Sequence, residues 1–134
     1  MGIVYHSNFF VYFEIGRTDY FRKLGFTYKQ LERENIFMPV TDCSCGFLLP
    51  AYYDDELDIH TELEMLSRLK LKFSYRVIRR SDNKQIAEGF TVHVPVNRAG
   101  VPCRIPNPYL EALSQTSHIK GSSDAKGFQD GGIQ

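Results

Sequence analysis

One stretch near the N-terminus restricts the fold of this chain more than any other feature. Residues 9–13 read Phe-Phe-Val-Tyr-Phe, inside a segment from Phe9 to Leu24 that predicts a helix. A helix that is apolar on every face is buried rather than laid on a surface. Asn8 is placed to be its N-cap and Gly25 to be its C-cap. We therefore expect a central helix that other elements cover.

The elements that follow this helix are mostly strands. We expect a short second helix over residues 27–34, opened by a capping box of Thr27 and Gln30. We expect a strand over residues 40–49, stopped by Pro50, and alternation of apolar and polar side chains predicts strands over residues 57–66, 69–77 and 86–96, joined by short turns. A short helix over residues 106–113 closes the folded part. One long helix wrapped by consecutive antiparallel strands is an α+β arrangement.

Composition and charge narrow the class of protein. A chain of 134 residues is enough for one domain. Its 16 basic and 16 acidic residues cancel, which removes the bulk attraction to nucleic acid or to an anionic membrane. No membrane span or secretory leader is visible. Cys43, Cys45 and Cys103 do not form a disulfide or zinc pattern. We expect a cytoplasmic protein that needs no metal and no cofactor.

The composition changes at residue 115. Ser, Gly, Asp and Lys dominate from there on, and the large apolar residues are Ile119, Phe128 and Ile133. Such a segment has too few apolar side chains to join a core. We therefore expect a domain over residues 1–114 and a flexible, dispensable C-terminal tail over residues 115–134.

Several stretches resemble a known enzyme family. They are Gly2-Ile3-Val4-Tyr5-His6-Ser7-Asn8-Phe9, Tyr12-Phe13-Glu14, Arg17-Thr18-Asp19-Tyr20-Phe21, Pro39-Val40, residues 50–57, Glu88-Gly89 and Val92-His93-Val94. Together they are similar to the hotdog-fold acyl-CoA thioesterases of the 4-hydroxybenzoyl-CoA thioesterase group, especially its YbgC-like branch. The resemblance implies a hotdog fold, assembly into homodimers or homotetramers, and hydrolysis of acyl-CoA to free acid and CoA. Acyl carrier protein stays open as the donor.

The candidate site lies in the loop before the first helix. Thioester hydrolysis needs a group that stabilises the carbonyl oxygen, and backbone amides at a buried helix start suit that role. These amides would come from about Tyr5 to Phe9. His6 would orient the thioester or donate to its oxygen, and its alternative is a loop histidine that faces solvent. Val4, Ser7 and Asn8 are candidate substrate contacts in the same loop.

The attacking step needs a carboxylate, and the sequence offers two candidates. In the family an Asp lies seven residues before the His that matches His6, which falls two positions before Met1. We therefore expect a chain without this Asp and without most of the first strand, through a late start at Met1, which binds acyl-CoA but hydrolyses it poorly. Glu14 is the substitute within the chain, unless it pairs with Arg17 or Thr18. The alternative function is a catalytically impaired protein that binds acyl thioesters.

A basic run is the last candidate. Arg68, Lys70 and Lys72 begin a series of cations along one predicted strand, continued by Arg76, Arg79 and Arg80. Such cations are able to bind the phosphates of CoA. The alternative is an ordinary solvated face of the sheet.

Overall fold

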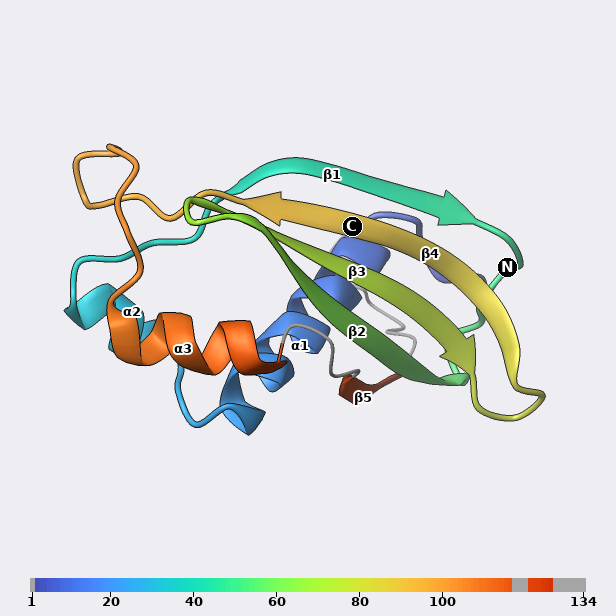
Figure 1. Ribbon diagram of the computed structural model, residues 1–134. Helices are drawn as coiled ribbons and strands as arrows, with labels where there is room; N and C mark the ends of the chain where they lie inside the picture. Colours follow the sequence, from blue (N-terminus) through green and yellow to red (C-terminus); the bar gives the residue numbers. More distant parts are fainter. Residues whose placement is uncertain (1, 117–120, 127–134) are drawn as a thin grey trace.

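The computed structural model describes residues 2–116 and 121–126 (Figure 1). The elements are α1 (Asn8–Lys23), α2 (Tyr28–Arg33), β1 (Val40–Phe47), β2 (Glu56–Ser67), β3 (Lys70–Arg79), β4 (Lys84–His93), α3 (Asn107–Thr116) and β5 (Gly121–Lys126). Within these residues, no helix has the length and apolar character needed to cross a membrane.

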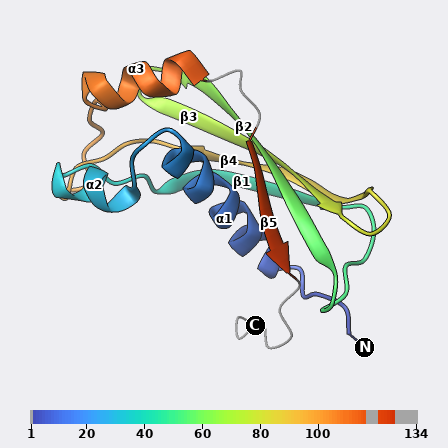
Figure 2. The ribbon, with the colours of Figure 1, turned by 90° about the horizontal axis from the view of Figure 1, so that it is seen from below.

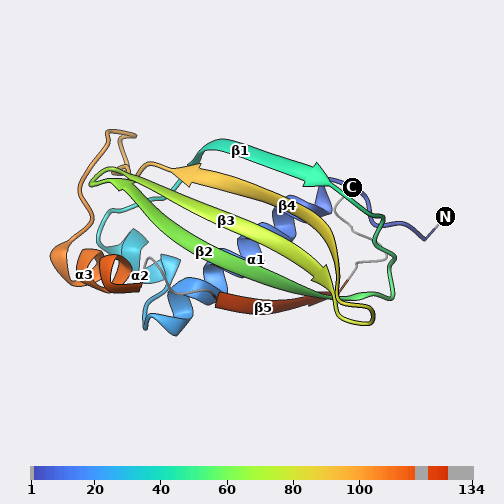
Figure 3. The same cartoon turned by 45° about the vertical axis from the view of Figure 1, so that its right-hand side comes forward.

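The strands form one antiparallel sheet in the order β1-β4-β3-β2-β5. The sheet curves around α1, which runs across its inner face (Figures 2 and 3). The N-terminal segment lies at one end of the sheet, whereas α2 and α3 lie at the other (Figures 1 and 3). This is the predicted α+β arrangement of a sheet wrapped around a long helix.

Local signals explain where the helices begin and end. Gly25 has a φ of 95°, and its amide donates to the carbonyl of Arg22 while the amide of Phe26 donates to Phe21. This left-handed residue closes α1 as predicted. Before α2, the Thr27 Oγ1 accepts from the Gln30 amide at 3.2 Å, and the Gln30 side chain accepts from the Thr27 amide at 2.7 Å. The predicted capping box is therefore confirmed.

Two glycines let α1 lie close against the sheet. A Cβ at Gly16 would lie 2.6 Å from the Thr61 Oγ1. A Cβ at Gly89 would lie 2.8 Å from the Phe13 ring and would overlap the backbone carbonyl of Ser44. Phe13 in turn stacks on the Tyr75 ring, with centroids 4.3 Å apart. The position of α1 over β2 and β4 therefore depends on missing side chains as well as on apolar packing.

A directed chain of hydrogen bonds crosses this core. The Tyr75 hydroxyl lies 2.7 Å from the Thr91 Oγ1, which lies 2.9 Å from the Nε2 of His93. The other ring nitrogen of His93 lies 2.9 Å from the Met38 carbonyl. A carbonyl only accepts, so His93 donates from Nδ1, accepts from Thr91 at Nε2, and leaves Thr91 to accept from Tyr75. Burial, aided by the charge of Arg17, lowers the pKa of His93 to about 4, which fits this neutral form.

Two expectations about burial differ from the structure. Phe9, Tyr12 and Phe13 are buried, but Phe10 is 38% exposed, because the sheet covers only one side of α1 within a single chain. Strand β1 is also open: it pairs with β4 along one edge, and seven of its eight residues are exposed. The uncovered side of α1 and the free edge of β1 are both features that a second protein surface would cover.

The expected tail also differs from the structure. Helix α3 continues to Thr116, and residues Gly121–Lys126 form β5, which pairs with β2. Composition failed here because strand pairing uses backbone groups, so a polar segment is able to add to an open sheet edge. The rest of the expected tail, residues 117–120 and 127–134, lies outside the described residues.

Candidate active site

The loop before α1 forms a tight turn, and its cap differs from the prediction. Ser7 is the N-cap, with φ −65° and ψ −22°, and Asn8 is the first helical residue. No side chain caps this helix end. The predicted capping role of Asn8 is wrong, because Ser7 is the N-cap and the Asn8 side chain, 1% exposed, makes no capping hydrogen bond.

The turn leaves a defined set of amides free. The amides of Asn8, Phe9 and Phe10 donate to the carbonyls three residues earlier, at 3.0, 3.1 and 3.3 Å. The amides of Tyr5, His6 and Ser7 have no backbone acceptor among the described residues. Free amides at a helix start stabilise a negatively charged oxygen, and the helix dipole adds to the effect. Three of the five amides that the sequence proposed are therefore available for a ligand.

Two side chains beside these amides also lack partners. The Ser7 Oγ and both polar atoms of the Asn8 amide are buried without a hydrogen bond to any described residue. A buried polar group left unpaired costs about 1–3 kcal/mol, and such groups are rare in native proteins. The start of α1 is therefore a place where a ligand or water is expected to bind.

An apolar groove of about 300 Å³ opens next to this turn. It is lined by Ile3, Val4, His6, Phe9, Phe47, Leu48, Leu49, Pro50 and Ala51. The His6 ring packs at 4.3 Å from the Tyr5 ring and lies edge-on to Phe47 at 6.2 Å. His6 is exposed and is the single lining residue with a polar side chain. The polar turn before α1 and the apolar groove therefore meet at His6.

Backbone pairing fixes the walls of the groove. The Val4 amide donates to the Ala51 carbonyl at 2.7 Å, and the Tyr53 amide donates to Gly2 at 3.0 Å. The N-terminal segment therefore pairs with the loop that follows β1. This pairing keeps His6 next to the loop residues 47–51.

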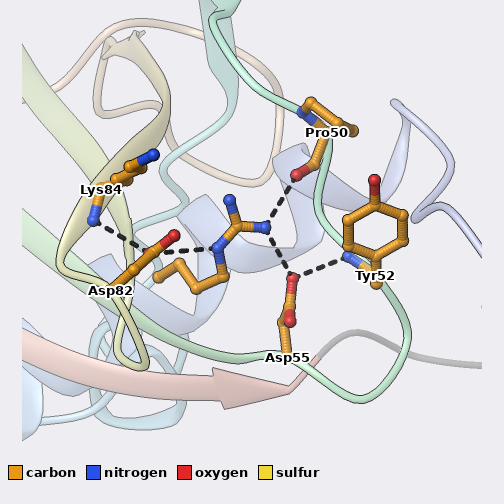
Figure 4. Close-up of polar contacts among 6 residues, drawn as sticks. Pro50, Tyr52, Asp55, Asp82 and Lys84 are labelled. Carbon is orange, nitrogen blue, oxygen red and sulfur yellow. Dashed lines mark hydrogen bonds and ion pairs between the residues drawn. The ribbon is translucent and has the colours of Figure 1, made fainter.

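Arg79 forms hydrogen bonds that hold the same loop in place. Its Nη1 donates to the Pro50 carbonyl at 3.1 Å and to Asp55 at 3.2 Å, and its Nε donates to Asp82 at 3.1 Å. Asp55 also accepts from the Tyr52 amide at 2.8 Å (Figure 4). The Arg79 side chain is only 13% exposed. It therefore joins the groove loop to β3 and to the turn between β3 and β4.

The structure brings together only part of the predicted site. Val4, Tyr5, His6, Ser7 and Asn8 lie together at the start of α1. Glu14 is exposed six residues further along the helix, about 9 Å along its axis, and does not line the groove.

The electrostatic neighbour of Glu14 is Arg17. Burial alone lowers the pKa of Arg17, but Tyr75, Tyr28 and Glu14 together raise it above its ordinary value. Glu14 has the smallest of these three effects, and no ion pair joins it to Arg17 among the described residues, so the pairing of the two stays a prediction.

The basic residues lie away from the groove within one chain. Arg68 lines a hollow with Arg104 beside α3, at the opposite end of the sheet from the N-terminal segment (Figure 3). Lys70 is exposed at the start of β3, and Lys72 lies on the outer face with its Nζ 4.8 Å from the Phe90 ring. Arg80 pairs with Glu56 and Asp58, as Arg79 does with Asp55 and Asp82.

Sequence reasoning missed the groove loop and its anchor. Leu48 and Leu49 were assigned to the strand, which ends at Phe47, although three apolar residues in a row before Pro50 break the alternation that a half-buried strand shows. Nothing in the sequence marks Arg79 among its basic neighbours. Among the described residues, no cluster of His, Cys, Asp and Glu side chains is arranged to hold a metal ion.

Known proteins resemble this chain in sequence and in fold. Residues 1–113 match the thioesterase-like superfamily. The acyl-CoA thioester hydrolase YbgC of Escherichia coli is 30% identical over 77 residues, which are 58% of each chain. A DHNA-CoA thioesterase from Staphylococcus aureus superimposes with a TM-score of 0.81 at 29% identity, over 87% of this chain and 80% of that one. A hypothetical protein from Aquifex aeolicus gives 0.77 at 36% identity, over 84% and 86%.

The match spans the turn, α1, strands β1 to β4 and most of α3, so it includes every element that builds the candidate site. The chain is therefore a member of the thioesterase-like superfamily, and it has the hotdog fold.

Proposed function

We propose that this protein hydrolyses acyl-CoA thioesters to the free acid and CoA. The observation that carries the proposal is the start of α1, where free amides and two unpartnered polar side chains meet His6 at an apolar groove. Membership of the thioesterase-like superfamily supports it. So do the names of the relatives, which include an acyl-CoA thioester hydrolase and a DHNA-CoA thioesterase.

The helix start would act on the carbonyl oxygen of the thioester. Hydrolysis places negative charge on this oxygen, and prearranged amides stabilise that charge in the transition state. The free amides of Tyr5, His6 and Ser7 are at the positive end of the α1 dipole. The His6 imidazole is a second donor at the same place, and Asn8 has spare donor and acceptor atoms.

The attack of water needs a general base. No carboxylate lines the groove in the part of the chain that the structure describes. We propose that the base is the Asp that the resemblance places seven residues before His6, and that Glu14 is structural. A positioned base contributes roughly 10²–10⁴-fold in rate. Residues 1–134 alone should therefore bind acyl-CoA but hydrolyse it slowly. Adding an upstream segment that contains this Asp should raise the rate by roughly 10²–10⁴-fold.

A second copy is proposed to complete the site. The exposed Phe47 at the end of β1 packs edge-on against Phe9, with ring centroids 5.2 Å apart, and Phe10, the next residue of α1, is exposed as well. An unpaired strand edge of eight residues is a template for pairing with another chain. We propose a homodimer that pairs β1 with its twofold copy and that covers the groove, with a tetramer as a further level of assembly.

The direct test is the hydrolysis of acyl-CoA by purified protein. His6→Ala should lower kcat, and Asn8→Ala should raise KM or lower kcat while the fold is kept. Lys29→Ala is the matched control, because Lys29 is exposed on α2, at the opposite end of the sheet from the N-terminal segment (Figure 1). We expect Arg68, Lys70 and Lys72 to contribute to CoA binding only if the second copy brings them to the groove. Equal rates for the His6 variant and the wild type would contradict the proposed site.

The second candidate is a binding protein of the same fold. The specific observation in its favour is the absence of a carboxylate among the groove residues. It predicts binding of acyl-CoA without turnover, both in residues 1–134 alone and in a form with the added Asp.

Two further properties are proposed and tested separately. The hydrolysis assay with acyl carrier protein in place of CoA identifies the donor, and cell fractionation tests the proposed cytoplasmic location.

A further inference from the structure

We infer that the groove beside His6 holds the acyl part of the substrate and selects uncharged, apolar acyl groups of about ten non-hydrogen atoms or fewer. This inference rests on the proposed function, because it gives the substrate class of the same site.

The lining of the groove is uniformly apolar apart from His6. Ile3, Phe47, Leu48 and Leu49 are 39%, 50%, 54% and 40% exposed, although each would gain free energy from burial. The carbonyl of Pro50 is occupied by Arg79. A contiguous exposed apolar surface of this kind marks a binding site.

The position of the groove identifies which part of a thioester fits it. His6 lines the groove and also belongs to the turn with the free amides, so a carbonyl oxygen bound there leaves one substituent along the groove. The two substituents of a thioester are the acyl chain and the CoA arm. The CoA arm has amides and phosphates, which need donors and cations that the groove does not have. The acyl chain therefore occupies the groove.

The volume of the groove indicates how much of the acyl group a single chain buries. About 300 Å³ is the space of about ten water molecules at roughly 30 Å³ each. A methylene group fills a space similar to that of a water molecule. The groove therefore holds about ten non-hydrogen atoms, enough for a medium-length chain or a single aromatic ring.

A charged acyl group should be rejected. A carboxylate buried in an apolar site without a cation is strongly unfavourable. Arg79 is the cation next to the loop, but Asp55 and Asp82 already pair with it. No lysine or arginine is among the described residues that line the groove.

The experiment compares affinity and kcat/KM over a series of acyl-CoA esters, using the full chain. Each added methylene should improve both quantities by about fourfold until the groove is full, after which the gain should stop. Valeryl-CoA and glutaryl-CoA form the matched pair, because they have the same chain length and differ by a terminal carboxylate. We expect glutaryl-CoA to be at least about 100-fold worse.

Variants connect this selectivity to the groove. Leu48→Arg supplies a cation and should narrow the gap between valeryl-CoA and glutaryl-CoA. Leu66→Arg is the control, because Leu66 is a similarly exposed leucine at the far end of β2. The control should leave the gap unchanged.

The outcomes separate the inference from the proposed function. Chain-length-dependent binding without turnover supports the inference and contradicts the enzyme. Turnover with equal use of glutaryl-CoA and valeryl-CoA overturns the inference and leaves the enzyme. If Leu48→Arg changes the oligomeric mass but not the selectivity, the groove is a subunit contact and the inference is wrong.

Discussion

Stability should fall by about 3 kcal/mol when the pH is lowered from 7.5 to 4, because of His93 alone. Its ring is fully buried and accepts a hydrogen bond from Thr91 at Nε2, so protonation would break the chain that runs from Tyr75 to Met38. Burial, together with the charge of Arg17, lowers the pKa of His93 from 6.5 to about 4. The unfolded chain therefore takes up a proton near pH 6.5, whereas the folded protein resists it until about pH 4.

The sign and size follow from proton linkage. A depressed pKa in the folded state gives stability that is present above the unfolded pKa and is lost as the pH falls through the folded pKa. The difference between 6.5 and about 4, at about 1.4 kcal/mol per pKa unit, gives about 3.5 kcal/mol in full, of which about 3 kcal/mol is lost by pH 4, where half of the folded molecules are protonated at His93. Most of this loss should occur between pH 6.5 and pH 4.

The assay is urea unfolding at a series of pH values, for the wild type and for His93→Gln. Carboxylates titrate in both proteins, so the difference between the two curves isolates His93. We expect the wild type to lose about 3 kcal/mol more than the variant over this range. Parallel curves would refute the assignment of a buried neutral His93.

Three further predictions concern packing, the base and assembly. Gly89→Ala should destabilise the protein by about 3 kcal/mol or more, because the added Cβ would collide with the Ser44 carbonyl and the Phe13 ring. Gly46→Ala is the control, because its Cβ would meet nothing closer than 3.9 Å. Urea unfolding measures the stability of both variants. Glu14→Gln should leave the hydrolysis rate within about twofold, and a loss of 10²–10⁴-fold without unfolding would make Glu14 the base. Cys43→Lys, at an exposed position on the free edge of β1, should weaken the proposed dimer in analytical ultracentrifugation while the monomer stays folded.

The sequence predicted the order and type of nearly every element, because their signals are local. The strand alternation from residue 69 to 77 and the capping box at Thr27 both depend on neighbouring residues, and both are confirmed. The position of Gly25 at the end of α1 is a signal of the same kind.

Features that depend on tertiary contacts were not predicted from the sequence. The side chain of Asn8 was expected at the helix cap, but the core competes for it and leaves its amide buried. Strand β5 escaped because pairing to β2 uses backbone groups that composition does not describe. Arg79 has no local signal, since its partners Pro50 and Asp55 are more than twenty residues away.

Only the part of the candidate site that is continuous in sequence was predicted, because its signals are local. The residues from Val4 to Asn8 are consecutive, so one motif identified them together. The groove wall comes from the loop after β1, which reaches His6 only through the pairing of Val4 with Ala51. The basic residues were included on charge alone, and the sheet places them elsewhere.

The most direct test of the central claim follows the backbone amides of Tyr5, His6 and Ser7 by nuclear magnetic resonance. The ligand is an acyl-CoA analogue with a methylene inserted between sulfur and carbonyl, which keeps the carbonyl oxygen and resists hydrolysis. If the start of α1 binds this oxygen, these three amide protons should shift downfield on titration, together with the side-chain amide of Asn8. Saturable binding that leaves them unmoved, with shifts centred on Arg68 to Lys72 instead, would contradict the account.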